Sequence, residues 1–301
     1  MSSRLSFKEY LKSTVAEVSK ELSCIIPEHW DVPESLKVSM HYSLMAGGKR
    51  LRPLLVIAAA EAFGGSRAAA MPIACAVEIV HTYSLIHDDL PAMDDDDYRR
   101  GKLTNHKVYG EATAILAGDA LLTHAFYCIT QAGRKHGVPA EQLLSIVEEL
   151  AEMAGARGMV GGQVADMLGE QGITQLQELE FIHLHKTGDL IIFSLLAGGR
   201  VGGASAEQLE GLRRFGRDLG LAFQIQDDIL DLVGDEAKLG KATQSDVQQH
   251  KVTYPYFIGL DASQQEVERL THSAKQALAE AAIPDPGRLI EIADYLMKRD
   301  H

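Results

Sequence analysis

The chain contains no proline between Pro139 and Pro255, and apolar residues recur at helical spacing along most of its length. Proline ends or kinks a helix, so a long stretch without it permits several long helices in succession. A sustained alternation of apolar and polar residues, which would indicate strands, is not found in the sequence. The sequence therefore predicts an all-α fold, a single large bundle of long antiparallel helices.

One segment, from about Met71 to Leu90, is apolar on every side and is followed by Pro91. A helix that is apolar all round is typically buried, so we expect this one at the centre of the bundle. The other long helices are expected at about 111–132, 140–154, 175–197, 205–233, 263–282 and 287–299. No stretch rich in serine, glycine and proline separates them, so residues 1–301 are predicted to form a single domain.

The overall composition bounds the kind of protein. With 46% apolar and 24% charged residues over 301 positions, it is typical of a globular chain with a sizeable core. The net charge of −13 argues against a nucleic-acid partner, which requires a basic surface. Three scattered cysteines, Cys24, Cys75 and Cys128, indicate free thiols in a reducing compartment. Since neither a signal region nor an uncharged apolar run long enough to cross a bilayer is found, we expect a cytoplasmic protein without stable membrane insertion.

Two clusters of aspartate stand out because each lies on or beside an apolar helix. Asp88, Asp89 and Asp94 fall within "HDDLPAMDDDDYRRG", where the apolar helix ends. In "FQIQDDILD", Asp227 and Asp231 are four residues apart and share one helix face, an arrangement that is destabilising unless a cation lies between them. Carboxylate oxygens suit hard divalent cations such as Mg²⁺, which typically joins carboxylates to phosphates. The clusters therefore predict magnesium and a phosphorylated ligand.

Basic residues support a phosphorylated ligand. Arg99 and Arg100 follow the first aspartate cluster at once, and arginine forks match phosphate oxygens in pairs. His81 lies two helical turns before Asp88 on the same face, which admits either a ligand role or a hydrogen-bonded core histidine. The remaining candidates are Lys49, Arg50 and Arg52 in "GGKRLRP", Lys186 and Thr187 in "HKTGDL", and Lys241 and Lys251 in "LGKATQSDVQQHK".

These motifs, in this order, resemble those of the trans-isoprenyl diphosphate synthases, and most closely the bacterial farnesyl diphosphate synthases. The shared motifs are "GGKRLRP", "HTYSLIHDDLPAMDDDDYRRGKLTNH", "GGQVADM", "HKTG", "FQIQDDILD" and "LGKATQSD", spread between about Tyr42 and Tyr256. The resemblance implies the isoprenoid synthase type of helical bundle around a central apolar cavity, and a homodimer. It also implies the Mg²⁺-dependent, head-to-tail condensation of isopentenyl diphosphate with dimethylallyl or geranyl diphosphate to give farnesyl diphosphate, with three ions when substrate is bound.

The resemblance assigns roles to individual residues. Those that would hold Mg²⁺ are Asp88, Asp94, Asp227 and Asp231, with Asp89 and Asp228 supporting them from behind. Those that would bind the allylic diphosphate are Arg99, Lys186, Thr187, Gln224 and Lys241. Those that would bind isopentenyl diphosphate are Lys49, Arg52, His81 and Arg100. Of all these, the residues expected to act directly in catalysis are Asp88, Asp94, Asp227, Lys186 and Thr187.

Product length is predicted from Tyr83 and Ser84. Tyr83 lies five residues before Asp88, about 7.5 Å further back along the same helix. A bulky, stiff ring there can act as the floor for the growing chain, whereas Ser84 is small and blocks little. The combination of a large residue at this position with the longer "DDxxxxD" spacing resembles the pattern of family members that stop at fifteen carbons. The alternative is that Tyr83 is only a core aromatic residue.

Two residues depart from the family pattern. Leu103 stands where proline usually follows "RRGK", so that loop is expected to be less rigid. Gln244 stands where glycine is usual in "GKxxGxD". If that glycine needs a positive φ, the loop that carries Lys241 takes a different path here.

Other functions remain open from the residues alone. A geranylgeranyl diphosphate synthase of the same family would share every motif. A class I terpene cyclase would show an Asn/Ser/Glu metal triad in place of "DDILD". A metal-dependent phosphohydrolase is suggested by His87 beside Asp88, but it would need further histidines at suitable spacing. A calcium loop would need glycine where "DDDDYRRG" has arginine, and a non-catalytic regulatory subunit would have lost the aspartates.

Overall fold

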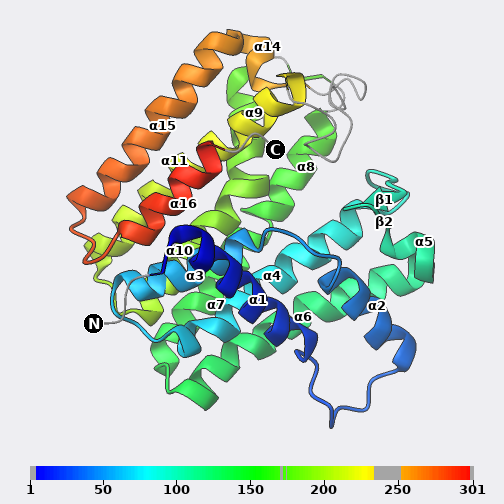
Figure 1. The fold of residues 1–301 in the computed structure, drawn as a ribbon. Coiled ribbons are helices and arrows are strands. Elements are labelled where there is room, and N and C mark those ends of the chain that lie inside the picture. Colours follow the sequence, from blue (N-terminus) through cyan, green and yellow to red (C-terminus); the bar gives the residue numbers. More distant parts are fainter. Residues whose placement is uncertain (1–4, 170–171, 174, 234–251, 299–301) are drawn as a thin grey trace. The chain divides into compact units, whose positions relative to one another are not determined.

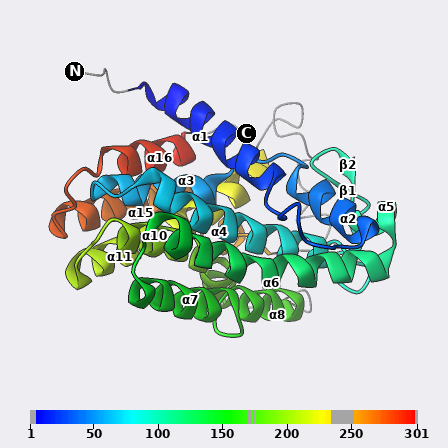
Figure 2. The same cartoon turned by 90° about the horizontal axis from the view of Figure 1, so that it is seen from below.

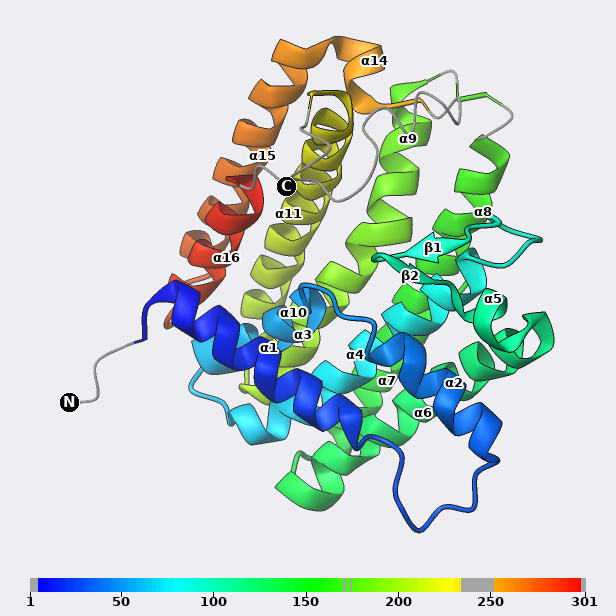
Figure 3. The same ribbon diagram turned by 45° about the vertical axis from the view of Figure 1, so that its right-hand side comes forward.

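The computed structural model of the chain describes residues 5–169, 172–173, 175–233 and 252–298. These residues are mostly helical, as Figures 1, 2 and 3 show from three directions, and the predicted all-α class is confirmed. Contacts between Cα atoms divide the chain into two compact units, residues 1–57 with 66–143 and residues 58–65 with 144–301. Each unit is described by itself.

The first unit is built mainly from helices α1, α2, α4, α5 and α6 and one small hairpin. Their bounds are α1 Phe7–Ser23, α2 Glu34–Leu44, α4 Arg67–Asp88, β1 Tyr98–Arg99, β2 Lys102–Leu103, α5 Asn105–Tyr109 and α6 Glu111–His136, and α3 Leu51–Ala62 begins in this unit. The helix expected from about Met71 thus begins at Arg67, and α6 extends past the expected end.

Helix α4 is the centre of the first unit, as its all-round apolar sequence predicts. Ser66 caps its first turn by accepting a hydrogen bond from the backbone N–H of Ala69. Val77, Ile79 and Val80 are fully buried, although they point in different directions around the helix. One side of α4 packs along α6, and the two helices lie next to each other in Figure 1. Apolar contact on all sides fixes the position of the acidic segment that follows α4.

A short antiparallel hairpin, not expected from the sequence, follows the acidic segment. Tyr98 pairs with Leu103 and Arg99 with Lys102, and the turn residues Arg100 and Gly101 have φ values of 53° and 73°. Two successive positive φ values are typical of the tight turn that matches strand twist. The Tyr42 hydroxyl donates to the Leu103 carbonyl at 2.7 Å, so the backbone at the position of the missing proline is held by a tertiary contact.

The second unit contains the end of α3, most of α7 Ala140–Ala154, and all later elements. These are α8 Met159–Gly169, α9 Leu176–Ile182, η1 His183–Gly188, α10 Asp189–Val201, α11 Ala206–Val233, α14 Tyr254–Ile258, α15 Leu260–Glu280 and α16 Gly287–Met297. Helix α11 packs on α10 and α15, and Figure 3 shows α15 and α16 beside it. Ile225 and Ile229 of α11 pack with Val267 and Leu270 of α15 in a buried cluster.

The helix expected at 175–197 is divided by η1, one turn of π-helix that carries "HLHKTG". Neighbouring helices approach its backbone through glycines. A side chain added at Gly162 of α8 would place its Cβ 2.2 Å from the backbone nitrogen of Lys186. One added at Gly220 of α11 would place Cβ 2.9 Å from the Gly188 Cα. Since π-helical turns often occur at functional sites, η1 marks this segment for attention.

Two described helices, α4 and α6, are long and apolar enough to cross a membrane. Within the most apolar stretch of α4, 72% of the residues are buried by other parts of the protein, against 44% in α6. A buried core helix of a water-soluble protein meets the same criterion, so neither helix argues strongly for a span.

A buried ion pair is predicted to be important for the stability of the first unit. Arg50 Nη1 lies 2.6 Å from Glu78 Oε1, and the two side chains are 2% and 3% exposed. Replacing Glu78 with alanine leaves the Arg50 charge buried without its counter-charge, so the free energy of unfolding should fall by about 3–5 kcal/mol. Denaturant unfolding measures this value. Glu280→Ala, which removes an exposed pair with Arg214, is the control and should leave the midpoint unchanged. Equal effects of the two substitutions would contradict the prediction.

Candidate functional site

The acidic segment after α4 folds back over the carboxyl end of that helix. The backbone N–H of Asp94 donates to the Asp88 carbonyl at 2.9 Å, and that of Asp95 to the Leu90 carbonyl at 3.1 Å. Two of the aspartates predicted to bind metal are thereby joined through the backbone. The carboxyl end of a helix carries partial negative charge, so aspartates there are unfavourable unless a cation compensates them. The geometry therefore suits a divalent cation.

Asp89 has a different environment from Asp88. Its side chain is buried, and its Oδ1 accepts a hydrogen bond from Arg99 Nε at 2.6 Å. Burial raises the pKa of the Asp89 carboxyl, while the ion pair with Arg99 opposes that rise. Arg99 also reaches Asp96 at 3.4 Å. Asp89 thus fixes the orientation of an arginine that is expected to bind a diphosphate.

The glycine turn in "GGKRLRP" lies against the hairpin arginine. Gly47 and Gly48 have φ values of 94° and 122°, which side chains rarely adopt. A Cβ at Gly48 would lie 2.6 Å from Arg100 Nη1, and the same nitrogen donates to the Gly47 carbonyl. The turn therefore needs glycine for both its backbone angle and the space that Arg100 occupies. Two motifs expected to bind isopentenyl diphosphate meet here.

Positive charge is concentrated around His81. The pKa of its imidazole is well below the usual value, first because the ring is buried and then because four arginines lie near it. These arginines are Arg52, Arg100, Arg99 and Arg50. The imidazole is therefore neutral at physiological pH and can donate one hydrogen bond while it accepts another. His81 thus lies among the arginines but contributes no charge itself.

Arg52 provides a sign that this cationic cluster needs an anion. Burial lowers the pKa of its guanidinium to about 10, Glu78 opposes this shift, and Arg100 adds to it. Within the described residues its Nε is buried and has no hydrogen-bond partner. A buried donor without a partner is costly, and a bound diphosphate oxygen would satisfy it. Arg50, by contrast, turns inward and pairs with Glu78, so it belongs to the core. Lys49, from the same motif, is exposed.

In the second unit, one cavity of about 170 Å³ brings together three of the residues expected to bind the allylic substrate. They are Lys186 and Thr187 of η1 and Gln224 of α11. Asp166 of α8 lines the same cavity, and its Oδ2 lies 2.6 Å from Lys186 Nζ. The ion pair holds the ammonium group at the cavity wall, where it can meet a phosphate oxygen.

The aspartates of α11 divide into different environments. Asp228 is buried, and its Oδ2 accepts the backbone N–H of Tyr254 at 2.7 Å and lies 3.2 Å from His183 Nε2. It therefore ties α11 to α14 and η1, which agrees with a supporting role. Asp227 is half-buried, whereas Asp231 is only 1% exposed. Asp227 is thus the more accessible of the two predicted metal ligands on this helix.

The described residues contain no group of three or more His, Cys, Asp or Glu side chains placed to hold a metal unaided. This arrangement still fits Mg²⁺, which is usually held by one or two carboxylates together with substrate phosphates. Asp88 with Asp94, and Asp227, supply carboxylates of that kind. Lys241 and Gln244 lie outside the described residues.

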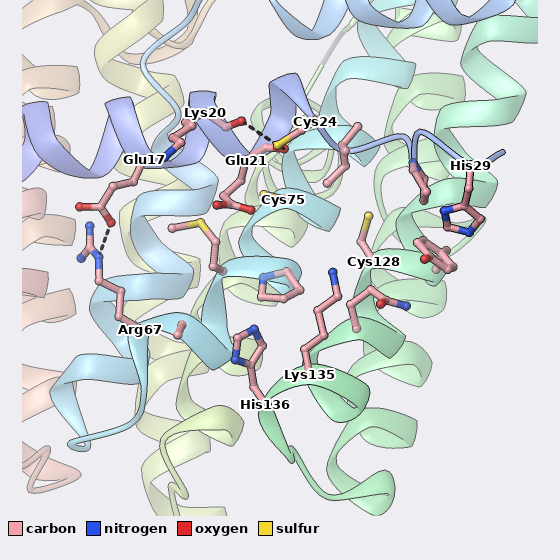
Figure 4. A pocket seen from close by; sticks show the side chains of 17 residues that line it. Glu17, Lys20, Glu21, Cys24, His29, Arg67, Cys75, Cys128, Lys135 and His136 are labelled. Carbon is pink, nitrogen blue, oxygen red and sulfur yellow. Dashed lines mark hydrogen bonds and ion pairs between the residues drawn. The ribbon is translucent and has the colours of Figure 1, made fainter. Parts of the chain in front are cut away.

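A cavity of about 790 Å³ in the first unit is lined by none of the residues expected to bind metal or substrate. Figure 4 shows Cys24, Cys75 and Cys128 among the side chains around it. All three are free thiols, as expected. Burial raises the pKa of Cys75 well above normal and that of Cys128 to about 12, so both stay protonated at neutral pH. Size alone therefore does not identify the site.

Sequence reasoning missed three residues that organise the site. Glu78 compensates the arginine cluster from within an otherwise apolar helix, and a single acidic residue there gives little signal. Asp166 could have been found, since "GGQVADM" is one of the shared motifs. His183 lies two residues before the start of "HKTG", and only the tertiary structure reveals its contact with Asp228.

Comparisons with known proteins identify the family of the chain. A profile of the polyprenyl synthetase family matches residues 33–284. The chain is 48% identical to a farnesyl diphosphate synthase of Geobacillus stearothermophilus, covering 99% of each protein. It is 49% identical to a chloroplastic geranylgeranyl pyrophosphate synthase of Catharanthus roseus, covering 100% of this chain and 83% of that protein. A solved FPP/GFPP synthase of Zymomonas mobilis superimposes with a TM-score of 0.84 at 34% identity, covering 97% of this chain and 98% of that one.

The predicted resemblance is confirmed over a longer part of the chain than its motifs span. A family profile that matches most of the sequence, joined by relatives nearly half identical over its full length, establishes that the chain belongs to the polyprenyl synthetase family.

Proposed function

We propose that the protein is a prenyltransferase that condenses isopentenyl diphosphate head to tail with dimethylallyl and then geranyl diphosphate, giving farnesyl diphosphate. The observation that carries the proposal is the presence of two separate cationic sites, one in each unit: a cluster of arginines in the first and the single lysine Lys186 in the second. One surrounds His81, and the other lines the cavity at Lys186 and Thr187. A reaction that joins two diphosphate-bearing substrates needs two cationic sites, whereas a terpene cyclase, which has one such substrate, needs one.

The chemistry begins with the allylic diphosphate. Bound Mg²⁺ supplies Lewis-acid polarisation of the leaving group. Lys186, held by Asp166, stabilises the negative charge that develops on the diphosphate oxygens as the C–O bond breaks. The electron pair of that bond leaves with the diphosphate, and an allylic cation remains. The hydroxyl oxygen of Thr187 and nearby carbonyl oxygens stabilise this cation.

The second substrate then supplies the nucleophile. Arg52, Arg100 and neutral His81 orient isopentenyl diphosphate, and its double bond attacks the cation to form the new C–C bond. Loss of a proton to the released diphosphate restores a double bond, so no separate side-chain base is required. Water must be excluded, because it would quench the cation. An apolar cavity with charge only at its entrance meets that need.

Several finer features belong to the same proposal. Mg²⁺ would be held by Asp88, Asp94, Asp227 and Asp231, and three ions would be bound together with substrate. Lys49 and Arg52 bind isopentenyl diphosphate, whereas Lys241 joins Lys186 on the allylic substrate. The proposal also includes a cytoplasmic homodimer with all 301 residues of each chain in one domain.

A geranylgeranyl product is the second candidate, because the Catharanthus roseus relative bears that name. The two products are distinguished by incubating the protein with isopentenyl and dimethylallyl diphosphates and Mg²⁺, then identifying the prenyl alcohols after dephosphorylation. A fifteen-carbon alcohol as main product supports the proposal, and a twenty-carbon one favours the second candidate. Absence of any condensed product would refute both.

The metal assignment predicts the effect of removing single carboxylates. Asp88→Ala or Asp227→Ala should lower kcat by about 100-fold or more, because each removes an anchor for the charge that stabilises the leaving group. Steady-state turnover with Mg²⁺ measures this. Asp95→Asn is the matched control, since Asp95 belongs to the same acidic run and is exposed, and it should keep nearly normal turnover. Near-normal activity of Asp88→Ala would exclude the assignment.

The two cationic sites predict separate effects on the two substrates. Arg52→Ala should lower the affinity for isopentenyl diphosphate by about 10-fold or more, since each charge-assisted hydrogen bond is worth about 1.5–3 kcal/mol. Lys186→Ala should instead lower the affinity for the allylic substrate. Titrations with a non-reactive analogue of each substrate measure both affinities, with exposed Lys8→Ala as the control. The two-site assignment fails if each variant loses the same affinity for both ligands.

Product length is predicted to depend on Tyr83, whose ring is 6% exposed. Tyr83→Ala should open space beneath the growing chain and shift the main product towards twenty carbons or more. Tyr83→Phe is the control, because it keeps the ring and should keep the fifteen-carbon product. Chromatography of the dephosphorylated products gives the ratio. An unchanged ratio in Tyr83→Ala would show that the residue serves only the core.

A further inference from the structure

His87 connects the proposed floor residue to the neighbouring helix. It lies one turn after Tyr83 on α4, and the two rings meet edge to face, with centroids 5.7 Å apart and planes at 80°. His87 Nε2 lies 3.1 Å from the Ile115 carbonyl oxygen of α6. A carbonyl oxygen can only accept, so Nε2 carries the hydrogen. The imidazole is therefore held by Ile115 on one side and contacts Tyr83 with its ring.

The position of the imidazole depends on a missing side chain. A Cβ at Gly118 of α6 would lie 2.1 Å from His87 Nε2 and 2.6 Å from its Cδ2, distances that no real Cβ shows. Any residue other than glycine at position 118 would force the imidazole to move. Asp119 cannot replace the lost contact as placed, because its Oδ1 lies 4.0 Å from Nε2, too far for a hydrogen bond.

We propose that His87, held by Gly118 and the Ile115 carbonyl, is a positioning residue that keeps the Tyr83 ring in the orientation that ends chain growth. This inference rests on the proposed function and on Tyr83 as its floor. A floor gives a sharp product length only if it does not move, and a tyrosine ring has two side-chain torsions to be fixed. The contact with the imidazole restricts those torsions. Gly118 then affects product length through His87, without touching the substrate.

The simpler role for His87 is to tie α4 to α6. In that case its loss would lower the stability of the fold and leave product length unchanged. Stability and product length are separate measurements, so the two roles can be told apart.

The principal test is Gly118→Ala in the full-length protein. It displaces the imidazole without altering any residue proposed to bind metal or substrate. The ratio of twenty-carbon to fifteen-carbon product should rise about two- to tenfold, the change expected from losing one aromatic edge contact. Gly133→Ala is the matched control: it lies in the same helix, and its Cβ would meet the flexible Leu143 side chain. The control should keep the wild-type ratio.

A second substitution guards against misfolding of the first. His87→Ala removes the imidazole without adding bulk and should shift the ratio in the same direction. If Gly118→Ala does not fold, His87→Ala decides the question alone. An unchanged ratio in every folded variant, even with a lowered melting temperature, would overturn the proposal.

Combination with Tyr83→Ala tests whether the effect passes through Tyr83. In that background Gly118→Ala should add no further shift, because the ring that the imidazole holds is already gone. Shifts that add in full would overturn the proposal. Failure of the proposed function looks different, since the wild-type protein would then form no condensed product. A wild type that makes longer chains would revise the product alone, and the relative shift would still decide the role of His87.

Discussion

The packing of α4 against α6 is the interaction on which the first unit depends. It holds the end of α4, and with it Asp88 and the turn that leads to Asp94. It also places His87 against the backbone of α6, where the imidazole contacts the Tyr83 ring. Because α4 is buried on all sides, it cannot rotate without breaking apolar contact everywhere. A rigid helix can therefore carry unfavourable charge at its end, which a marginal helix could not.

Charge is left unbalanced both in the arginine cluster and among the aspartates after α4. Arg52 and Arg100 lie close together, with Glu78 as the buried counter-charge beside Arg50. Aspartates gather at the carboxyl end of α4, where the helix dipole opposes them. In the proposed function these charges meet two different substrates: the arginines would be neutralised by isopentenyl diphosphate, and the aspartates by the magnesium that accompanies the allylic diphosphate. Binding of each ligand would thus compensate charge that the folded protein leaves unbalanced. This electrostatic gain contributes to affinity independently of apolar contact.

The sequence was sufficient for the fold class, for most helix positions and for the motifs. Helix α7 has the predicted bounds, and the helices at 205–233 and 287–299 differ by at most two residues, because apolar periodicity and glycine stops are local signals. The π-helical turn at Lys186 was not predictable, since it depends on packing from α8 and α11. Nor could sequence separate Arg50 from Arg52, because the direction of each side chain depends on the positive φ of Arg50 and on Glu78 far along the chain.

Glycine explains much of what the sequence concealed. Within a helix it costs about 1 kcal/mol relative to alanine, so Gly118, Gly162 and Gly220 look like weaknesses when read singly. In the structure each leaves space that another group fills: the imidazole of His87, the backbone at Lys186 and the backbone at Gly188. Close approach then recovers the lost stability as packing contact. The proposed substrate and floor residues are thus positioned partly by side chains that are absent, and a single sequence does not reveal which glycines serve this purpose.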